Sequence, residues 1–142
     1  MDLATCTYHE YRPDMGHPVR TTVGAPRFAL EYTLLGPARL ITPTRAMLGL
    51  PQDAYQLAYR RLLNATGAAR IHAELAGIAA AADAVTGRSS ARLVLLCFDR
   101  LDKRGGWCHR TMFAAWWLEQ TGQELPELGA TLPSQPTPPT LF

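Results

Sequence analysis

The spacing of hydrophobic residues changes along this chain of 142 residues, and it predicts strands in some segments and helices in others. Strand-favouring residues fill positions 3–8, and an unbroken apolar run covers positions 93–98. An apolar run of this length is typical of a strand that is buried on both faces of a parallel sheet. We predict strands at both segments and a further short strand at positions 39–42.

Helical spacing dominates the second half of the chain. Apolar residues recur at helical intervals from Pro51 to positions 64–67 and again from 71 to 85, which predicts two consecutive helices. A third helix is predicted from 108 to 121, with Gly122 placed to end it. Its aromatic stripe is predicted to pack against the sheet and consists of Met112, Phe113, Trp116 and Trp117.

Strands that alternate with helices predict the fold class: α/β, as a small Rossmann-like three-layer domain with a mostly parallel sheet. We expect residues 1–128 to form this single domain and the proline-rich tail, residues 129–142, to be disordered. Between positions 10 and 50, glycine and proline are too frequent for a long element. Loops of this length are uncommon unless they are functional, so this segment is expected to cover or line a site.

Composition narrows the class of protein further. Hydrophobic residues make up 47% of the chain, which excludes global disorder, and the net charge of +2 is too small for the whole surface to attract nucleic acid. The sequence has neither a run of eighteen apolar residues nor a secretory signal. We therefore expect a cytoplasmic protein with no membrane partner.

Basic residues are unevenly distributed. All of them but Lys103 are arginine, a bias that fits a GC-rich genome before it indicates anion binding. Positions 15–52 nevertheless hold four arginines and a single acidic residue, Glu31. This segment is locally basic although the chain as a whole is nearly neutral.

Three cysteines, an odd number, in a chain without a secretory signal predict free thiols rather than a disulfide framework. Cys97 lies inside the apolar run at 93–98 and is expected to be a packed core thiol. Cys108 lies at the start of the third predicted helix, where a thiolate is favoured, so it is a candidate nucleophile. A buried, unreactive thiol is the alternative at Cys108.

Positive residues crowd the start of the third predicted helix, where His109 and Arg110 follow Cys108. A helix N-terminus carries a partial positive charge, so each added cation there is unfavourable by about 0.3–1 kcal/mol unless an anion compensates. One interpretation is a bound phosphate or carboxylate, held by loop amides and the Arg110 guanidinium. The other is an internal ion pair of Arg110 with Asp99 or Asp102, and the sequence leaves both open.

Soft metal ligands follow two predicted strands. If these strands are neighbours, Cys6 and His9 lie near Cys97 and Cys108. Together with His109 they supply enough ligands for a tetrahedral zinc ion, although adjacent residues such as Cys108 and His109 rarely both bind one ion. The two pairs are far apart in the chain, so we keep zinc as an alternative and assign no metal ligand. Motifs of the types H-E-x-x-H, G-x-G-x-x-G and G-x-x-x-x-G-K-[ST] are absent from the sequence, and we expect no cofactor.

Several motifs together resemble one known family, the domain-of-unknown-function family 488. The motifs are LVLLCF at 93–98, WCHR at 107–110 and GQELPEL at 122–128, with YR at 11–12 and GAPRF at 24–28 in the N-terminal part. The resemblance covers most of residues 3–128, and the insert at 100–104 and His9 depart from the family pattern. It implies a small α/β protein of bacteria or their phages, without an established reaction. The positions that match its motifs, and that it marks as site residues, are Arg12, Arg27, Cys97, Cys108, His109 and Arg110.

One leading prediction of function and two alternatives follow. The leading prediction is a site for an anionic small molecule, a nucleotide or a nucleic-acid fragment, at the start of the third helix; whether the protein is an enzyme stays open. The alternatives are a non-catalytic protein-binding or inhibitory module, whose segment 15–50 contacts a protein partner, and a zinc-binding protein. The candidate ligand-binding residues are Arg12, Arg27, Arg110, Cys97 and Tyr11, and the candidate catalytic residues are Cys108 and His109.

Overall fold

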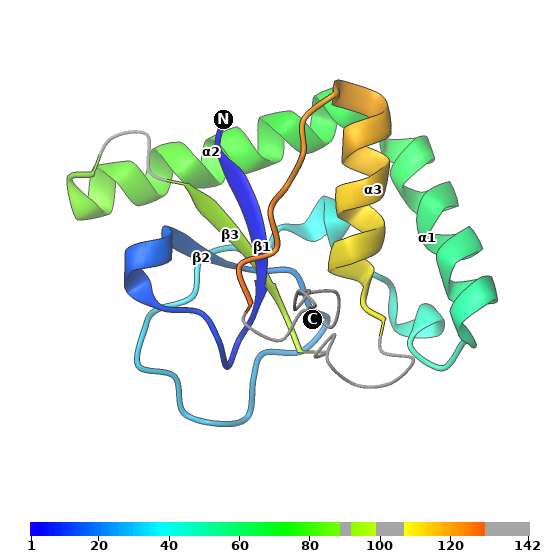
Figure 1. Ribbon diagram of the computed structural model, residues 1–142, viewed down its shortest axis with the longest axis horizontal. Coiled ribbons are helices and arrows are strands. Elements are labelled where there is room, and N and C mark those ends of the chain that lie inside the picture. Colours follow the sequence, from blue (N-terminus) through cyan, green and yellow to red (C-terminus); the bar gives the residue numbers. More distant parts are fainter. Residues whose placement is uncertain (89–91, 99–106, 130–142) are drawn as a thin grey trace, which may run out of the picture.

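The apolar run at positions 93–98 forms the central strand of a parallel sheet, as its two-sided burial predicts. The computed structural model describes residues 1–88, 92–98 and 107–129. In this part of the chain, strand β3 (Leu93–Cys97) lies between β1 (Leu3–Thr7) and β2 (His17–Arg20), and both neighbours run parallel to it (Figure 1). All five residues of β3 are buried.

Three α-helices pack against one face of the sheet. They are α1 (Gln52–Thr66), α2 (Ala68–Thr86) and α3 (His109–Thr121). Their apolar residues form one core with the side chains of Leu3, Leu93 and Leu95, which point to the same face because strand side chains alternate. The predicted aromatic stripe is confirmed as core at three of its positions, Phe113, Trp116 and Trp117.

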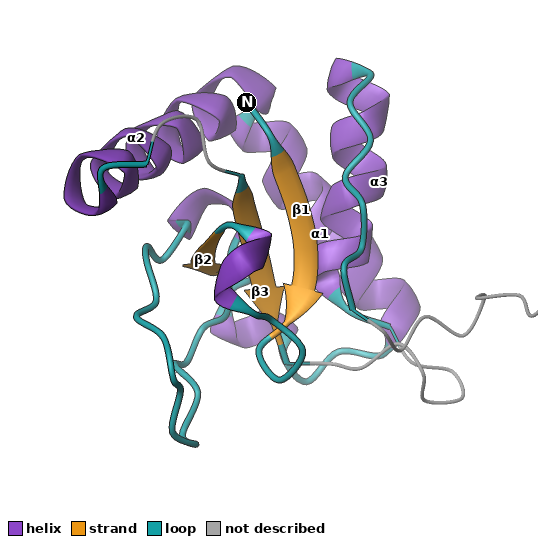
Figure 2. Ribbon diagram, turned by 60° about the vertical axis from the view of Figure 1, so that its left-hand side comes forward, coloured by secondary structure: helices purple, strands orange, loops and turns teal. Residues whose placement is uncertain are grey.

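The opposite face of the sheet is covered by loops and a short 3-10 helix, η1 (Pro13–Met15), rather than by an α-helix of the described residues (Figure 2). A smaller core on this face contains Cys6, Val94 and Leu96. The α/β class and the parallel sheet are thus confirmed. The Rossmann-like arrangement is not confirmed, because it requires helices on both faces.

The helix boundaries follow the local signals in the sequence. Gly67 separates α1 from α2 with a φ of 85°, and Gly122 ends α3 in the left-handed region with a φ of 79°. Glycine adopts such values without the steric cost that other residues meet there. The predicted extents of all three helices agree with the structure to within a few residues.

One prediction about the N-terminal half is wrong, and one strand was not predicted. Positions 39–42 form no strand but a 3-10 helix, η2 (Arg39–Ile41), because the Glu74 carboxylate of α2 accepts hydrogen bonds from the Arg39 and Leu40 amides at 2.9 and 3.1 Å. Another 3-10 helix, η3 (Arg45–Met47), follows. Strand β2 was not predicted, because Pro18 lies inside it and proline argues against a strand.

The chain after α3 returns to the sheet and extends it. The Thr5 amide donates to the Pro126 carbonyl at 2.9 Å, and the Leu128 amide donates to the Thr5 carbonyl at 2.7 Å. This pairing ties residues 126–128 to the outer side of β1. The tail that was predicted to be disordered lies, beyond Gly129, outside the described residues. No helix in the described ranges has the length and apolar character needed to cross a bilayer.

Candidate functional site

The carboxyl ends of the three strands meet at one edge of the sheet, which we call the carboxyl edge. Thr7 of β1 is in register with Cys97 of β3, and Arg20 of β2 with Leu96. In Figure 2 the arrowheads of β1 and β3 point to this same edge. Parallel α/β sheets bind their ligands at this edge, so the residues that follow the strands form the candidate site.

Two of the three cysteines are joined by a disulfide, which corrects the prediction of free thiols. Cys97 ends β3 and Cys108 caps the N-terminus of α3, and their sulfurs are bonded. The helix starts directly beside the strand end, and this brings together two cysteines that are 11 positions apart. Cys97 is therefore no packed thiol, and Cys108 holds no thiolate in this oxidised state. Cys6 is the free thiol, and burial raises its pKa to about 12.

His109 is buried next to the disulfide and is oriented by Thr21, the residue that follows β2. Its Nε2 lies 2.9 Å from the Thr21 carbonyl oxygen and 3.0 Å from the Thr21 hydroxyl. That hydroxyl donates its own hydrogen to the Leu96 carbonyl at 2.7 Å, so both Thr21 oxygens act as acceptors and Nε2 carries the hydrogen. Nδ1 then carries the lone pair, 3.8 Å from the Cys108 sulfur.

Burial lowers the pKa of His109 to about 4, and the neighbouring Arg110 charge acts in the same direction, while the Thr21 hydrogen bond opposes them. The imidazole is consequently neutral at neutral pH. The sequence interpretation of this position assumed a charge that His109 does not carry.

Arg110 has an internal counter-ion, Glu127, whereas the predicted partners Asp99 and Asp102 lie outside the described residues. Its Nε donates to Glu127 Oε1 at 2.9 Å and its Nη2 donates to Glu127 Oε2 at 3.1 Å. The Arg110 side chain is 1% exposed and that of Glu127 is 11% exposed. Glu127 is fixed in turn by the Thr5 hydroxyl, which donates to it at 2.7 Å. A carboxylate of the chain thus holds two of the Arg110 nitrogens, which favours the internal ion pair over a bound anion.

The remaining predicted ligand residues lie in different environments. Tyr11 is buried and its hydroxyl donates to the Gly16 carbonyl, so it supports the loop layer. Arg12 is 69% exposed and lies 3.6 Å from the Asp14 carboxylate. Arg27 is exposed. The structure therefore does not gather the predicted arginines into one cluster.

Four aromatic side chains form a group at the carboxyl edge that the sequence had not identified, and we call it the aromatic rim: Tyr8, His9, Phe28 and Phe98. The rings of His9 and Phe28 are stacked, with centroids 4.3 Å apart and planes at 20°. The Tyr8 and Phe98 rings lie 4.9 Å apart. Phe28 is 37% exposed and Phe98 is 38% exposed, so part of each ring faces solvent.

Hydrogen bonds fix the loop that carries Phe28. The Arg20 guanidinium donates to the Thr22 and Val23 carbonyls at 3.0 and 2.6 Å. Further along, the Tyr32 hydroxyl donates to the Tyr8 carbonyl at 2.7 Å. Arg20 is thus a structural residue, and the loop is held to the end of β2 before Phe28 and to the end of β1 after it.

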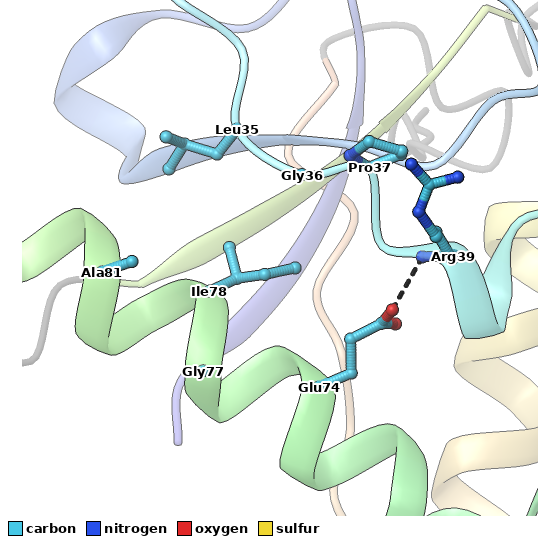
Figure 3. Close-up of a pocket in the computed structure, with 8 residues that line it drawn as sticks. All are labelled: Leu35, Gly36, Pro37, Arg39, Glu74, Gly77, Ile78 and Ala81. Atoms are coloured by element: carbon cyan, nitrogen blue, oxygen red, sulfur yellow. Dashed lines mark hydrogen bonds between the residues drawn. The ribbon is translucent and has the colours of Figure 1, made fainter.

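A separate groove of about 450 Å³ lies between α2 and the loop before η2 (Figure 3). Glu74, Gly77 and Ile78 of α2 line one wall, and Pro37 and Arg39 lie opposite. The Glu74 carboxylate is engaged by backbone amides of η2, as the dashed line in Figure 3 shows for Arg39. The groove's one carboxylate thus serves the fold.

The set of residues considered for zinc is assembled only in part. Cys6 points to the loop-covered face, whereas Cys97 points to the helix face, because they occupy alternate register positions. His9 is exposed in the aromatic rim. The three groups that do meet are Cys97, Cys108 and His109.

Comparison with protein-family models, with curated proteins and with solved structures finds no match for this chain. The resemblance to family 488 therefore stays a prediction, and the function has to be argued from the geometry of the carboxyl edge.

Proposed function

We propose that the protein binds a nucleotide, free or within a single-stranded nucleic acid, at the aromatic rim. The observation that carries this proposal is the stacked pair of Phe28 and His9 at the carboxyl edge, with Arg27 adjacent to Phe28 in the chain. An exposed aromatic ring offers a stacking surface to any base, and an arginine offers a planar fork to a phosphate.

The charge distribution supports this location over the start of α3. The Arg110 donors are engaged by Glu127, whereas Arg27 lies on the exposed part of the loop, in the segment that carries four arginines and one acidic residue. Arg12 is a second candidate for a phosphate contact, although Asp14 lies beside it. A cytoplasmic location, where free nucleotides are abundant, belongs to the same proposal.

For the disulfide state, the geometry supports binding without catalysis. In the disulfide state Cys108 offers no nucleophile, and the His109 imidazole is buried with Nε2 bound to Thr21. Neither group therefore acts on a ligand at the rim. Enzymatic chemistry at Cys108 or His109 would require another state of these residues than the disulfide form.

A binding titration with three probes tests the proposal. Fluorescence anisotropy of a labelled oligothymidylate of about eight nucleotides, and calorimetry with ADP and with inorganic phosphate, are measured on the wild type and on Phe28→Ala. Because stacking of one base contributes about 1–3 kcal/mol, we expect Phe28→Ala to weaken nucleotide binding by roughly 5- to 150-fold.

The matched control is Leu57→Ala, which removes an exposed apolar side chain from α1, away from the rim. This variant should bind as the wild type does. Equal binding of phosphate and ADP, or equal loss in both variants, would remove base stacking from the explanation. Stoichiometric co-purification of a protein, with no response to any of the three probes, would favour the protein-binding module instead.

A further inference from the structure

Three potential metal ligands converge at the start of α3, at a location separate from the aromatic rim. The ligand atoms of Cys97, Cys108 and His109 all lie within 4.8 Å of one another, and all three residues are buried. Cys97 comes from the end of β3, and the other two residues from the first turn of α3. The positions of the sheet and helix therefore fix the set, and no surface side chain contributes to it.

The histidine is oriented as a ligand rather than as a donor to the cysteines. Its Nε2–H is directed at the Thr21 oxygens, which leaves the Nδ1 lone pair facing the Cys108 sulfur. Metal-bound histidines use their second nitrogen in this way, with a backbone carbonyl or carboxylate as partner. Thr21 is thus already in the place of the supporting acceptor.

The distances fit a tetrahedral ion. Zinc–sulfur and zinc–nitrogen bonds of about 2.3 and 2.05 Å at a tetrahedral angle place the two donor atoms about 3.6 Å apart. The Cys108 sulfur and His109 Nδ1 are 3.8 Å apart. These two ligands thus need almost no movement, and only the Cys97 sulfur has to move away from its bonded partner.

We propose that the dithiol form of the protein binds one Zn²⁺ through Cys97 Sγ, Cys108 Sγ and His109 Nδ1. Two thiolates neutralise the charge of the ion, so the filled site is neutral, as a buried location requires. Three protein ligands leave the fourth tetrahedral position for a further donor such as water. This site goes beyond nucleotide binding and does not depend on it.

Zinc and the disulfide exclude each other. A phosphine reductant supplies two electrons that break the S–S bond; the phosphine takes the oxygen of one water to become a phosphine oxide, and the two hydrogens of that water form the two thiols. Zn²⁺ then displaces both thiol protons. Intracellular thiols are kept reduced in most organisms, so the dithiol form is the one expected in a cytoplasm.

The experiment compares metal uptake by the two redox forms of the full chain. Protein reduced with a phosphine is freed of reductant under argon, incubated with zinc, desalted and analysed for metal, next to protein kept oxidised. We expect about one zinc ion per chain in the reduced form and less than about 0.1 zinc ion per chain in the disulfide form. Uptake below a tenth in the reduced form overturns the proposal.

Variants assign the ligands. Cys97→Ser and Cys108→Ser should each abolish stoichiometric uptake, and His109→Gln should weaken zinc binding by at least about tenfold. Cys6→Ala is the control, since that thiol is buried on the other face of the sheet, and it should keep full uptake. Equal uptake by the wild type and the two serine variants would contradict the assignment.

Cobalt provides a readout that does not depend on any variant folding correctly. Co²⁺ added to the reduced wild type should give the intense visible bands of a tetrahedral ion, together with a near-ultraviolet sulfur-to-cobalt transition. Zinc should remove both signals by displacement. A weak octahedral spectrum without the sulfur transition would refute a site built on two thiolates, whatever the metal content.

Discussion

Arg110 and Arg27 both belong to motifs that mark them as anion ligands, yet the fold places them in opposite environments. Arg110 is buried and makes two hydrogen bonds to Glu127, whereas Arg27 is exposed beside a stacked aromatic pair. A cluster of positive residues in a sequence therefore does not reveal the origin of its counter-charge. For Arg110 the counter-charge comes from the chain itself, 17 positions later.

The largest expected effect comes from removing the buried cation. Arg110→Met leaves the Glu127 carboxylate without its two arginine hydrogen bonds in a site that is 11% exposed, so we expect a loss of about 3–5 kcal/mol in the free energy of unfolding. Urea denaturation at neutral pH measures it. A loss below about 1 kcal/mol would show that the pair behaves like an exposed ion pair.

The matched double variant tests the cause of that loss. Arg110→Met with Glu127→Leu removes both charges, and buried pairs replaced in this way often recover stability. We expect the double variant to regain most of the lost free energy of unfolding. A small loss should remain, because the Thr5 hydroxyl no longer has its acceptor. A double variant as unstable as the single one would place the cost in packing rather than in the unpaired carboxylate.

A smaller effect is expected from His109, the neutral neighbour in the same buried corner. Its folded pKa of about 4 lies below the usual value of 6.5, so the unfolded chain binds a proton that the folded chain refuses between these values. Stability is therefore lost as the pH falls from about 6.5 towards 4, by up to about 3 kcal/mol in total.

This prediction applies to the oxidised, metal-free protein. Unfolding by urea is measured at pH 7 and near pH 4.5 for the wild type and for His109→Gln, whose amide cannot titrate. The wild type should lose about 2–3 kcal/mol more than the variant over this interval. The same pH dependence in both proteins would mean that other groups cause it.

The sequence predicts the elements whose boundaries depend on nearby residues, and it misses those that depend on contacts with distant segments. Helices α1 and α3 and strand β3 were predictable because their boundaries depend on residues inside the element or directly beside it. Gly122, which follows α3, is one example. Positions 39–42 were not, because Glu74 of another helix caps the amides there. Local patterns do not contain contacts between distant segments.

The site followed the same rule. The motif residues at 108–110, which the sequence singles out as site candidates, are all buried at the edge of the sheet. Their partners Glu127, Thr21 and Cys97 come from three separate segments. Without these partners the sequence predicted free thiols, which the disulfide corrects, and it left open whether the counter-charge of Arg110 is a ligand or a side chain of the protein.

The smallest effect on stability is expected at Arg27, and it sharpens the contrast with Arg110. Arg27→Gln changes an exposed side chain, so the free energy of unfolding should move by no more than about 0.5 kcal/mol. Oligothymidylate binding should nevertheless weaken, and the slope of log K against log salt should fall by about 0.7, because one phosphate contact is lost from a single strand.

Arg61→Gln is the charge-matched control, since it removes an exposed arginine from α1, which Figure 1 places on the other side of α3 from β1 and β2. Both variants lower the net charge equally, so a general electrostatic effect on binding would appear in both. Only a local phosphate contact separates them. If the two variants show the same slope of log K against log salt, Arg27 acts only through the overall charge. The aromatic rim would then bind the ligand by stacking alone.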